Sequence, residues 1–338
     1  MDGHVQKLVE KIQTQWCGRP KAAVDIMKNF RFLAVDVLSQ LAIGKPFGCA
    51  DADKDVHNFI SIFNAGTRVQ TSLSILPELK NLLIMFSHIP LLGGYLAPSP
   101  GDGSALGNKL NPSPIIQNVV RERFAKRGPK VEMLDMFIAR GLTEKDAMEE
   151  LLIIMSAGIE TTTTAFEAIL FLMLQTPGVL PKLQKEIDAV LASDSSYPIK
   201  ASTIHKMSYL QACISGGFVS THLRNHFIPG GTFVGINSKA AQLSRAFGDD
   251  VEKFRPDRWL EGDADVLAQM SRNLELVFNY GITKCLGMNI ACMALDKVIF
   301  EVFRNFNVGL DERSRPVGVE TVPRTLSLRV SPRTAENS

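Results

Sequence analysis

The residue that could do chemistry most directly in this sequence is a cysteine in a glycine-flanked loop. Cys285 lies between Gly281 and Gly287, and residues 288–306 have apolar side chains at helical spacing. A thiolate here would lie at a helix N-terminus, where unpaired N–H groups and the helix dipole stabilise an anion. The glycines would let the backbone approach a flat ligand, so the loop could present one sulfur to a haem iron. The alternative is a buried structural cysteine in an ordinary loop.

The longest helical pattern in the sequence runs from residue 143 to residue 175. Thr143 and Asp146 form a capping pair at its start, and the segment Thr176–Gly178 ends it. At 1.5 Å per residue the helix is roughly 45 to 50 Å long. Because this helix is apolar nearly all round, we expect it to be buried.

A second group with chemical potential lies in the middle of this helix, where Glu160 and Thr161 follow Ala157 and Gly158. A buried acid needs a partner or water, so Glu160 requires an explanation. Gly158 would leave room for a ligand near the backbone, and Thr161 could bond back to a carbonyl one turn earlier. Glu160 and Thr161 could then relay protons to a bound group. The alternative is a threonine-rich packing feature.

Both groups of residues resemble signatures of the cytochrome P450 family. The loop resembles the haem-binding signature Phe-x-x-Gly-x-Arg-x-Cys-x-Gly, and the helix resembles the proton-delivery motif Ala/Gly-Gly-x-Asp/Glu-Thr-Thr/Ser. The resemblance implies that Cys285 is the axial iron ligand of haem b and that Glu160 and Thr161 are catalytic. The residues to which it assigns cofactor binding are Ala157, Gly158, Phe278, Gly281, Lys284 and Gly287.

The sequence departs from the family at two places. Thr283 stands at the signature arginine, and Lys284 could supply only a point charge with poorer geometry. After Tyr209–Ile214, which resembles the start of the family's K helix, the expected Glu-x-x-Arg is absent. Arg258, in a stretch that resembles the family's meander, therefore lacks its usual partners. It must be rescued by another acid or lie exposed to solvent.

Composition limits the class of protein. The sequence has 338 residues, 45% hydrophobic and 21% charged, with a net charge of +2, so nothing indicates nucleic-acid binding. Its five cysteines show neither zinc-ligand nor disulfide spacing, which favours a reducing compartment. We expect no signal peptide and no transmembrane segment. The apolar residues 76–100 are broken by prolines and predict either a buried loop or peripheral membrane contact.

The resemblance implies a mainly α fold with small β regions, an incomplete cytochrome P450 fold. We expect one P450-like domain over residues 1–338, a fragment without the N-terminal anchor and the first sheet and helices. Within it, residues 144–175 form the long central helix, and residues 278–306 form the haem-binding loop and the following helix.

The implied function is that of a haem-thiolate monooxygenase that oxidises a small lipophilic metabolite, as in fungal secondary metabolite biosynthesis. Electrons would come from NADPH through NADPH-cytochrome P450 reductase, on the cytosolic side of the endoplasmic reticulum or in the cytoplasm. One alternative is a degenerate, non-catalytic P450 remnant or helical interaction protein without haem. Another attributes the departures to wrongly joined exons.

Overall fold

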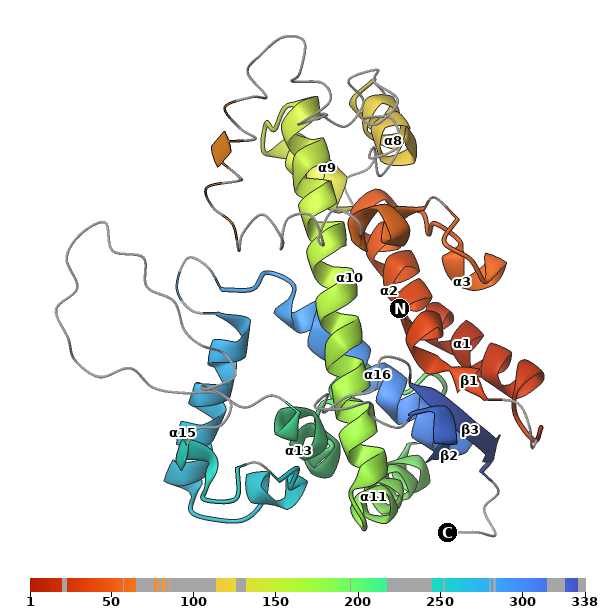
Figure 1. Ribbon diagram of the computed structural model, residues 1–338, viewed down its shortest axis with the longest axis vertical. Helices are drawn as coiled ribbons and strands as arrows, with labels where there is room; N and C mark the ends of the chain where they lie inside the picture. The colour runs from red at the N-terminus through yellow and green to blue at the C-terminus, as the bar shows by residue number, and fades with distance from the viewer. Residues whose placement is uncertain are drawn as a thin grey trace, which may run out of the picture. The chain divides into compact units, whose positions relative to one another are not determined.

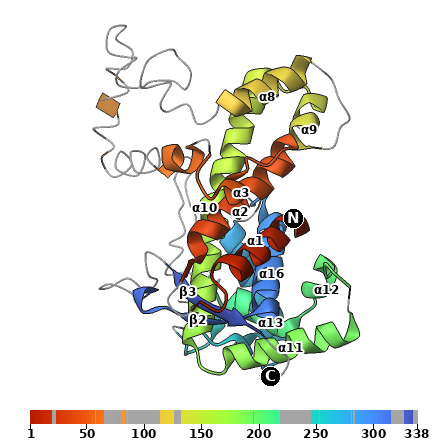
Figure 2. The ribbon, with the colours of Figure 1, turned by 90° about the vertical axis from the view of Figure 1, so that its right-hand side faces the viewer.

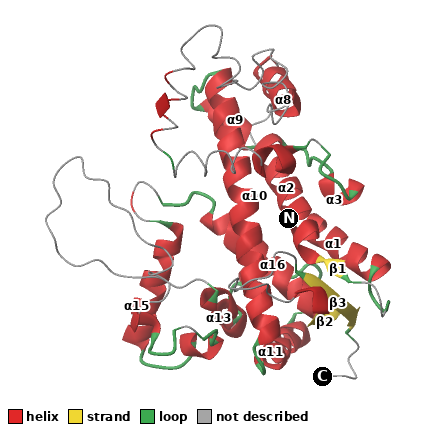
Figure 3. Cartoon of the chain, viewed as in Figure 1, coloured by secondary structure: helices red, strands yellow, loops and turns green. Residues whose placement is uncertain are grey.

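The structure of the protein is a computed structural model. It describes residues 1–19, 23–56, 58–64, 76, 78, 81–82, 85, 114–125, 132–194, 196–217, 245–251, 253–279, 281, 284–314 and 326–333. These residues are mainly helical with one small sheet (Figures 1 and 3), which confirms the predicted fold class. The chain divides into two compact units, unit 1 with residues 1–30 and 161–338 and unit 2 with residues 31–160. The expectation of one domain over the whole chain stays a prediction.

The described elements have the following bounds. Helices include α1 (Asp2–Gln15), α2 (Ile26–Ile43), α3 (Cys49–Ala52), α8 (Pro114–Ala125), α9 (Met133–Ala139), α10 (Glu144–Gln175), α11 (Val179–Ser193), α12 (Ala201–Ile204), α13 (Ser208–Gly216), α15 (Ala264–Glu275) and α16 (Met288–Asn305). Short 3₁₀ turns are η1 (Arg245–Phe247), η2 (Pro256–Trp259), η3 (Leu276–Phe278) and η5 (Glu312–Ser314). The strands are β1 (Val24–Asp25), β2 (Phe306–Leu310) and β3 (Ser327–Pro332).

In unit 1 the other helices are organised around α16, which packs against α1, α11, α12 and α13. Leu295, Val298, Ile299 and Val302 recur at helical spacing on α16 and are all buried, so one face of the helix is core. The chain then continues from α16 directly into β2 of the antiparallel sheet, whose order is β1-β3-β2. The loop that precedes α16 is thus attached to a helix that forms part of the core of this unit.

Helix α2 is preceded by a short strand. Val24 and Asp25 pair with β3 as strand β1, opposite Leu328 and Ser327. The helix begins at Ile26, and the Lys28 N–H donates to Asp25 Oδ1 at 2.9 Å. An aspartate that accepts an N–H of the first turn is a helix N-cap, and this cap together with the strand pairing sets the boundary.

Unit 2 has its own core, made by α2 from residue 31 onward, α8, α9 and α10 as far as residue 160. Its buried members include Phe32, Val35, Phe59, Ile116, Leu134, Leu151 and Met155. The turn after α2 is held by the Asp36 carboxylate. Its Oδ1 accepts the N–H groups of Gly48 and Cys49 and its Oδ2 that of Ala50, at 2.8, 3.0 and 2.9 Å. Three backbone donors at the start of α3 are thereby satisfied.

Helix α10 has the bounds that the sequence predicts, and Figure 2 shows it as one continuous helix. Thr143 Oγ1 donates to Asp146 Oδ2 at 2.6 Å, and the Asp146 N–H donates back to Thr143 Oγ1 at 3.2 Å. This confirms the predicted cap, and the hydrogen bonds from Thr143 lower the pKa of Asp146. The helix belongs to unit 2 up to Glu160 and to unit 1 from Thr161.

One helix among the described residues, α10, is long and apolar enough to cross a bilayer by length and composition. The prediction from the sequence was that no apolar run is long enough to span a bilayer. A single helix of this kind is weak support for a membrane span, since core helices of water-soluble proteins have the same properties. Most of the apolar stretch 76–100 lies outside the described residues, as does residue 283.

Candidate functional site

The loop with Cys285 is closed by its own backbone. Phe278 is the last residue of η3, and its carbonyl accepts the Cys285 N–H at 2.7 Å. Gly281 has a φ of +67°, a backbone conformation that favours glycine, and its carbonyl accepts the Lys284 N–H at 3.2 Å. Gly287 is the N-cap of α16, so Cys285 lies two residues before that cap. The structure therefore places the cysteine where the sequence predicted it, at the start of a helix.

Among the described residues, no side chain caps the N-terminus of α16. The cap residue Gly287 makes no side-chain hydrogen bond, and the first turn carries no acidic residue. The Cys285 side chain beside it is exposed. Its neighbour Leu286 is 98% exposed, which leaves an apolar side chain in contact with water at this loop.

The other cysteines have environments that suppress thiolate formation. Of the five cysteines, all within the described residues, Cys285 is the exposed one. Burial, followed by the nearby Asp296 and Cys285, raises the pKa of Cys292. Burial also raises the pKa of Cys49, to about 11, and that of Cys213. Of the five cysteines, Cys285 is therefore the one whose sulfur a metal could reach most directly.

Lys284, predicted to meet an anionic edge of the cofactor, has a partner of its own. Its Nζ lies 3.3 Å from Oε2 of Glu275, the last residue of α15. Both side chains are exposed, so the pair is weak and can exchange for another anion.

One stripe of α10 is exposed, which corrects the expectation that the helix is buried on all sides. Ile153, Ala157, Thr161 and Thr164 are exposed, at spacings of four, four and three residues, and such positions lie on one helical face. The stripe is apolar or small at Ile153 and Ala157 and carries hydroxyls at Thr161 and Thr164. A face of this composition suits contact with a largely apolar ligand that accepts a few hydrogen bonds.

Glu160 has the partner that its place in an apolar helix requires. Arg31 of α2 approaches it through two atoms, with Nε 3.1 Å from Oε1 and Nη2 donating to Oε2 at 3.2 Å. The two side chains are 30% and 26% exposed, so the acid is only partly buried. Arg31 was not among the site residues that the sequence predicted. The signal that could have found it is a lone cation in the otherwise apolar segment Phe30–Ala34.

Gly158 is explained by the packing of two helices. A Cβ at this position would lie 2.8 Å from Leu38 Cδ1, so α2 fills the space beside it. Glycine lets the Leu38 side chain come this close, and a larger residue would displace it. Its assignment to cofactor binding gains no support from the contact.

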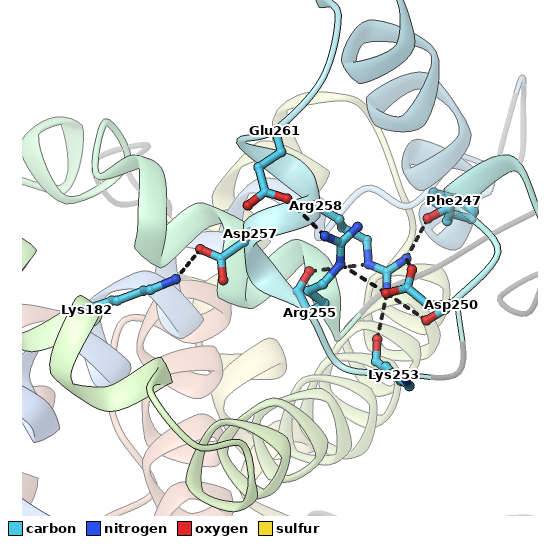
Figure 4. A network of polar contacts seen from close by, with 8 residues as sticks. All are labelled: Lys182, Phe247, Asp250, Lys253, Arg255, Asp257, Arg258 and Glu261. Atoms are coloured by element: carbon cyan, nitrogen blue, oxygen red, sulfur yellow. Dashed lines mark hydrogen bonds and ion pairs between the residues drawn. The ribbon is translucent and has the colours of Figure 1, made fainter.

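Arg258, the meander arginine of the sequence analysis, is buried and satisfied locally (Figure 4). It is 5% exposed, and its Nη1 lies 3.0 Å from Oδ1 of Asp250. Its N–H groups donate to the carbonyls of Phe247, Asp250, Lys253 and Arg255 at 2.6 to 3.3 Å. Burial lowers the pKa of Arg258, and the charge of Asp250 opposes that shift. Of the two predicted outcomes, rescue by another acid is confirmed.

The described residues fit a haem on its thiolate side. An exposed cysteine sulfur ahead of a helix is a suitable single axial ligand. Leu286 beside it offers apolar surface that a flat macrocycle would cover.

Comparisons with known proteins agree with this description. The chain matches the family model described as Cytochrome P450 over residues 1–215 and 219–333. It is 32% identical over 320 residues to the cytochrome P450 monooxygenase ABA1 of Pyricularia oryzae, which covers 88% of this chain and 61% of that protein. It is also 32% identical over 308 residues to the cytochrome P450 monooxygenase aba1 of Botryotinia fuckeliana, with 85% and 59% covered. The chain thus spans 59% to 61% of the length of these two curated relatives.

A solved structure is similar over almost the whole chain. The match to the crystal structure of cytochrome P450DA heme domain has a TM-score of 0.72 and covers 99% of this chain and 72% of that one. At 18% sequence identity this likeness shows the fold.

Proposed function

Because this chain belongs to the cytochrome P450 family, we propose that it acts as a haem-thiolate monooxygenase on a small lipophilic metabolite. The observation that carries the proposal is the exposed Cys285, held by the Phe278 carbonyl directly ahead of α16. Two relatives of 32% identity are named as monooxygenases, which supports the reaction class. Their fungal origin supports a role in fungal secondary metabolite biosynthesis.

In this proposal the loop residues position one sulfur. Phe278 and Gly281 hold the loop closed through their carbonyls, and Gly287 keeps the approach to Cys285 clear of a side chain. Lys284 would exchange Glu275 for an anionic edge of the haem. When bound, the haem supplies dioxygen activation. One oxygen atom enters the substrate and the other leaves as water, with two electrons and two protons consumed.

In this proposal, Ala157, Glu160 and Thr161 of α10 act on the side of the haem where the substrate binds. Ala157 presents a small side chain on the exposed stripe, which lets a flat or apolar ligand lie close to the helix. Thr161 follows one turn later on the same stripe and supplies a hydroxyl. Glu160, next to it in sequence, is the acid from which protons would reach that hydroxyl.

The electrons that this reaction needs would come from NADPH through NADPH-cytochrome P450 reductase. We place the protein on the cytosolic side of the endoplasmic reticulum or in the cytoplasm, with peripheral membrane contact. The support for both statements is family membership.

The proposal is tested by the absorption spectrum of the reduced protein under carbon monoxide after haem-supplemented expression. A thiolate-ligated haem gives a red-shifted Soret band, and Cys285→Ser should abolish it. Cys292→Ser is the matched control, because this cysteine lies on α16, directly after the Cys285 loop, and its raised pKa keeps the thiol protonated. An apo spectrum of the unaltered protein would contradict the proposed function.

A further inference from the structure

We propose that Arg31 is a positioning residue for the proton donor of α10. Its guanidinium holds the Glu160 carboxylate in one orientation next to Thr161. The inference rests on the proposed function, since a fixed proton donor matters only to a reaction that consumes protons. Nothing in the sequence signatures assigns a role to Arg31.

The contact is a two-point ion pair. Arg31 Nη2 donates a hydrogen bond to Oε2 at 3.2 Å, and Nε lies 3.1 Å from Oε1 as an ion-pair contact without a hydrogen bond, so each carboxylate oxygen is contacted by a different nitrogen. A planar guanidinium that contacts both oxygens sets the rotation of the carboxylate as well as its place. A lysine ammonium, which acts as a point charge, would set only its place.

The two helices are held together close to this pair. Leu38 lies seven residues after Arg31 on α2, which puts both side chains on the same face of that helix. Leu38 fills the space beside Gly158, two residues before Glu160. The distance between the α2 and α10 backbones is therefore set by packing. This packing fixes the position of the Arg31 backbone relative to Glu160.

The pair lies on the flank of the exposed stripe. Glu160 is one residue before Thr161, a rotation of about 100° around the helix. The arginine and glutamate side chains are 30% and 26% exposed, so part of the pair is in contact with solvent. No other ion pair of Glu160 is found among the described residues, so nothing there replaces Arg31 when it is removed.

A pair this exposed contributes little to stability, and its effect is chiefly on orientation. Without Arg31 the carboxyl rotates, and proton transfer toward Thr161 slows because general-acid catalysis requires hydrogen-bond geometry. Dioxygen that has accepted two electrons then leaves with two protons as hydrogen peroxide, and the substrate stays unoxidised. The predicted signature is loss of coupling with unchanged haem loading.

The experiment compares Arg31→Met, Arg31→Lys, Glu160→Gln and the double variant Arg31→Met/Glu160→Gln in haem-loaded protein with reductase and NADPH. We expect Arg31→Met to lower the ratio of product to NADPH consumed by about tenfold or more. Arg31→Lys should restore only part of it. The double variant should lose no more than Glu160→Gln alone, because Arg31 acts through Glu160.

A second readout does not depend on turnover. Thermal unfolding of the same haem-loaded proteins, without substrate or electrons, should show only small changes in melting temperature in the Arg31 and Glu160 variants, because the exposed pair contributes little to stability. The control is Arg123→Met, which removes another partly buried guanidinium of unit 2, paired with Glu132 and Asp135. It should lower the melting temperature and leave coupling unchanged.

The outcomes separate the two proposals. A missing thiolate spectrum in the unaltered protein overturns the proposed function. A normal spectrum in every variant, with full coupling in Arg31→Met or additive losses in the double variant, overturns the role of Arg31. Full coupling in Arg31→Lys would overturn the two-point orientation.

Discussion

Arg258 Nη1 lies 3.0 Å from Asp250 Oδ1, inside a loop whose own carbonyls accept the remaining guanidinium N–H groups. The arginine is buried, whereas the aspartate is about one-third exposed at 35%. The carboxylate and the carbonyl groups that contact Arg258 come from residues 247–255, close to Arg258 in sequence. This loop is therefore stabilised locally and does not depend on the absent Glu-x-x-Arg of the K helix.

Replacing Arg258 with methionine should destabilise the protein by about 3 kcal/mol, because several carbonyls and Asp250 lose their donor together. Arg255→Met is the matched control. Its side chain is 44% exposed and pairs with Asp250 and Glu261, so the loss should stay within about 1 kcal/mol. Urea unfolding measures both. Equal losses would show that the buried arginine is no more important than its exposed neighbour.

Thr161→Val separates proton delivery from packing. Valine keeps the branched shape and removes the hydroxyl, and Thr161 is exposed, so packing alone predicts little change. If Thr161 relays protons, NADPH consumption should be diverted to peroxide while substrate binding persists. General acid assistance is commonly worth roughly 10² to 10⁴ in rate. Thr164→Val, on the same stripe, is the control, and unchanged coupling in both variants would rule out the relay.

Substitutions at Lys284 and at Glu275 should change haem retention in opposite directions. Glu275→Gln removes the competing carboxylate and should slow haem loss, whereas Lys284→Met should speed it. Each effect should be about two- to fivefold, as expected for one exposed charge contact. Transfer of haem to excess apomyoglobin measures the rate. If neither substitution changes it, Lys284 does not contact an anionic edge of the haem.

Glu301 on α16 should make the protein less stable as pH rises. Burial raises its pKa, although Arg304 and Asn305 partly oppose the shift. The folded state therefore holds this proton at pH values where the unfolded state has lost it. The contribution of Glu301 to the free energy of unfolding is fully present below the pKa of the unfolded state, about 4.3. It is lost as pH rises through the pKa of the folded state.

The variant that tests this is Glu301→Gln, which cannot ionise. It should be more stable than the unaltered protein at pH 7, with the difference vanishing below about pH 4. Glu261→Gln, at a position 62% exposed, should show no such trend. Chemical unfolding across the pH range provides the comparison, and a loss of stability at pH 7 would contradict the prediction.

The parts of the fold that the sequence predicts depend on patterns among residues close together in the chain. The apolar spacing of Val5, Leu8, Val9 and Ile12 predicts α1, and these four residues are buried. The capping pair Thr143 and Asp146 predicts where α10 starts. The beginning of α2 was not predictable in this way, because it depends on pairing of β1 with a strand some three hundred residues later in the chain.

By itself the sequence determined the family, the fold class, the long helix and the position of Cys285 ahead of α16, since each depends on residue types at short spacing. Only the tertiary structure identified Arg31 as the partner of Glu160, Leu38 as the reason for Gly158, and Asp250 as the acid for Arg258. The physical reason is that a polar or close-packed side chain specifies the kind of partner it needs. Which residue meets that need depends on how distant or irregular segments come together in space.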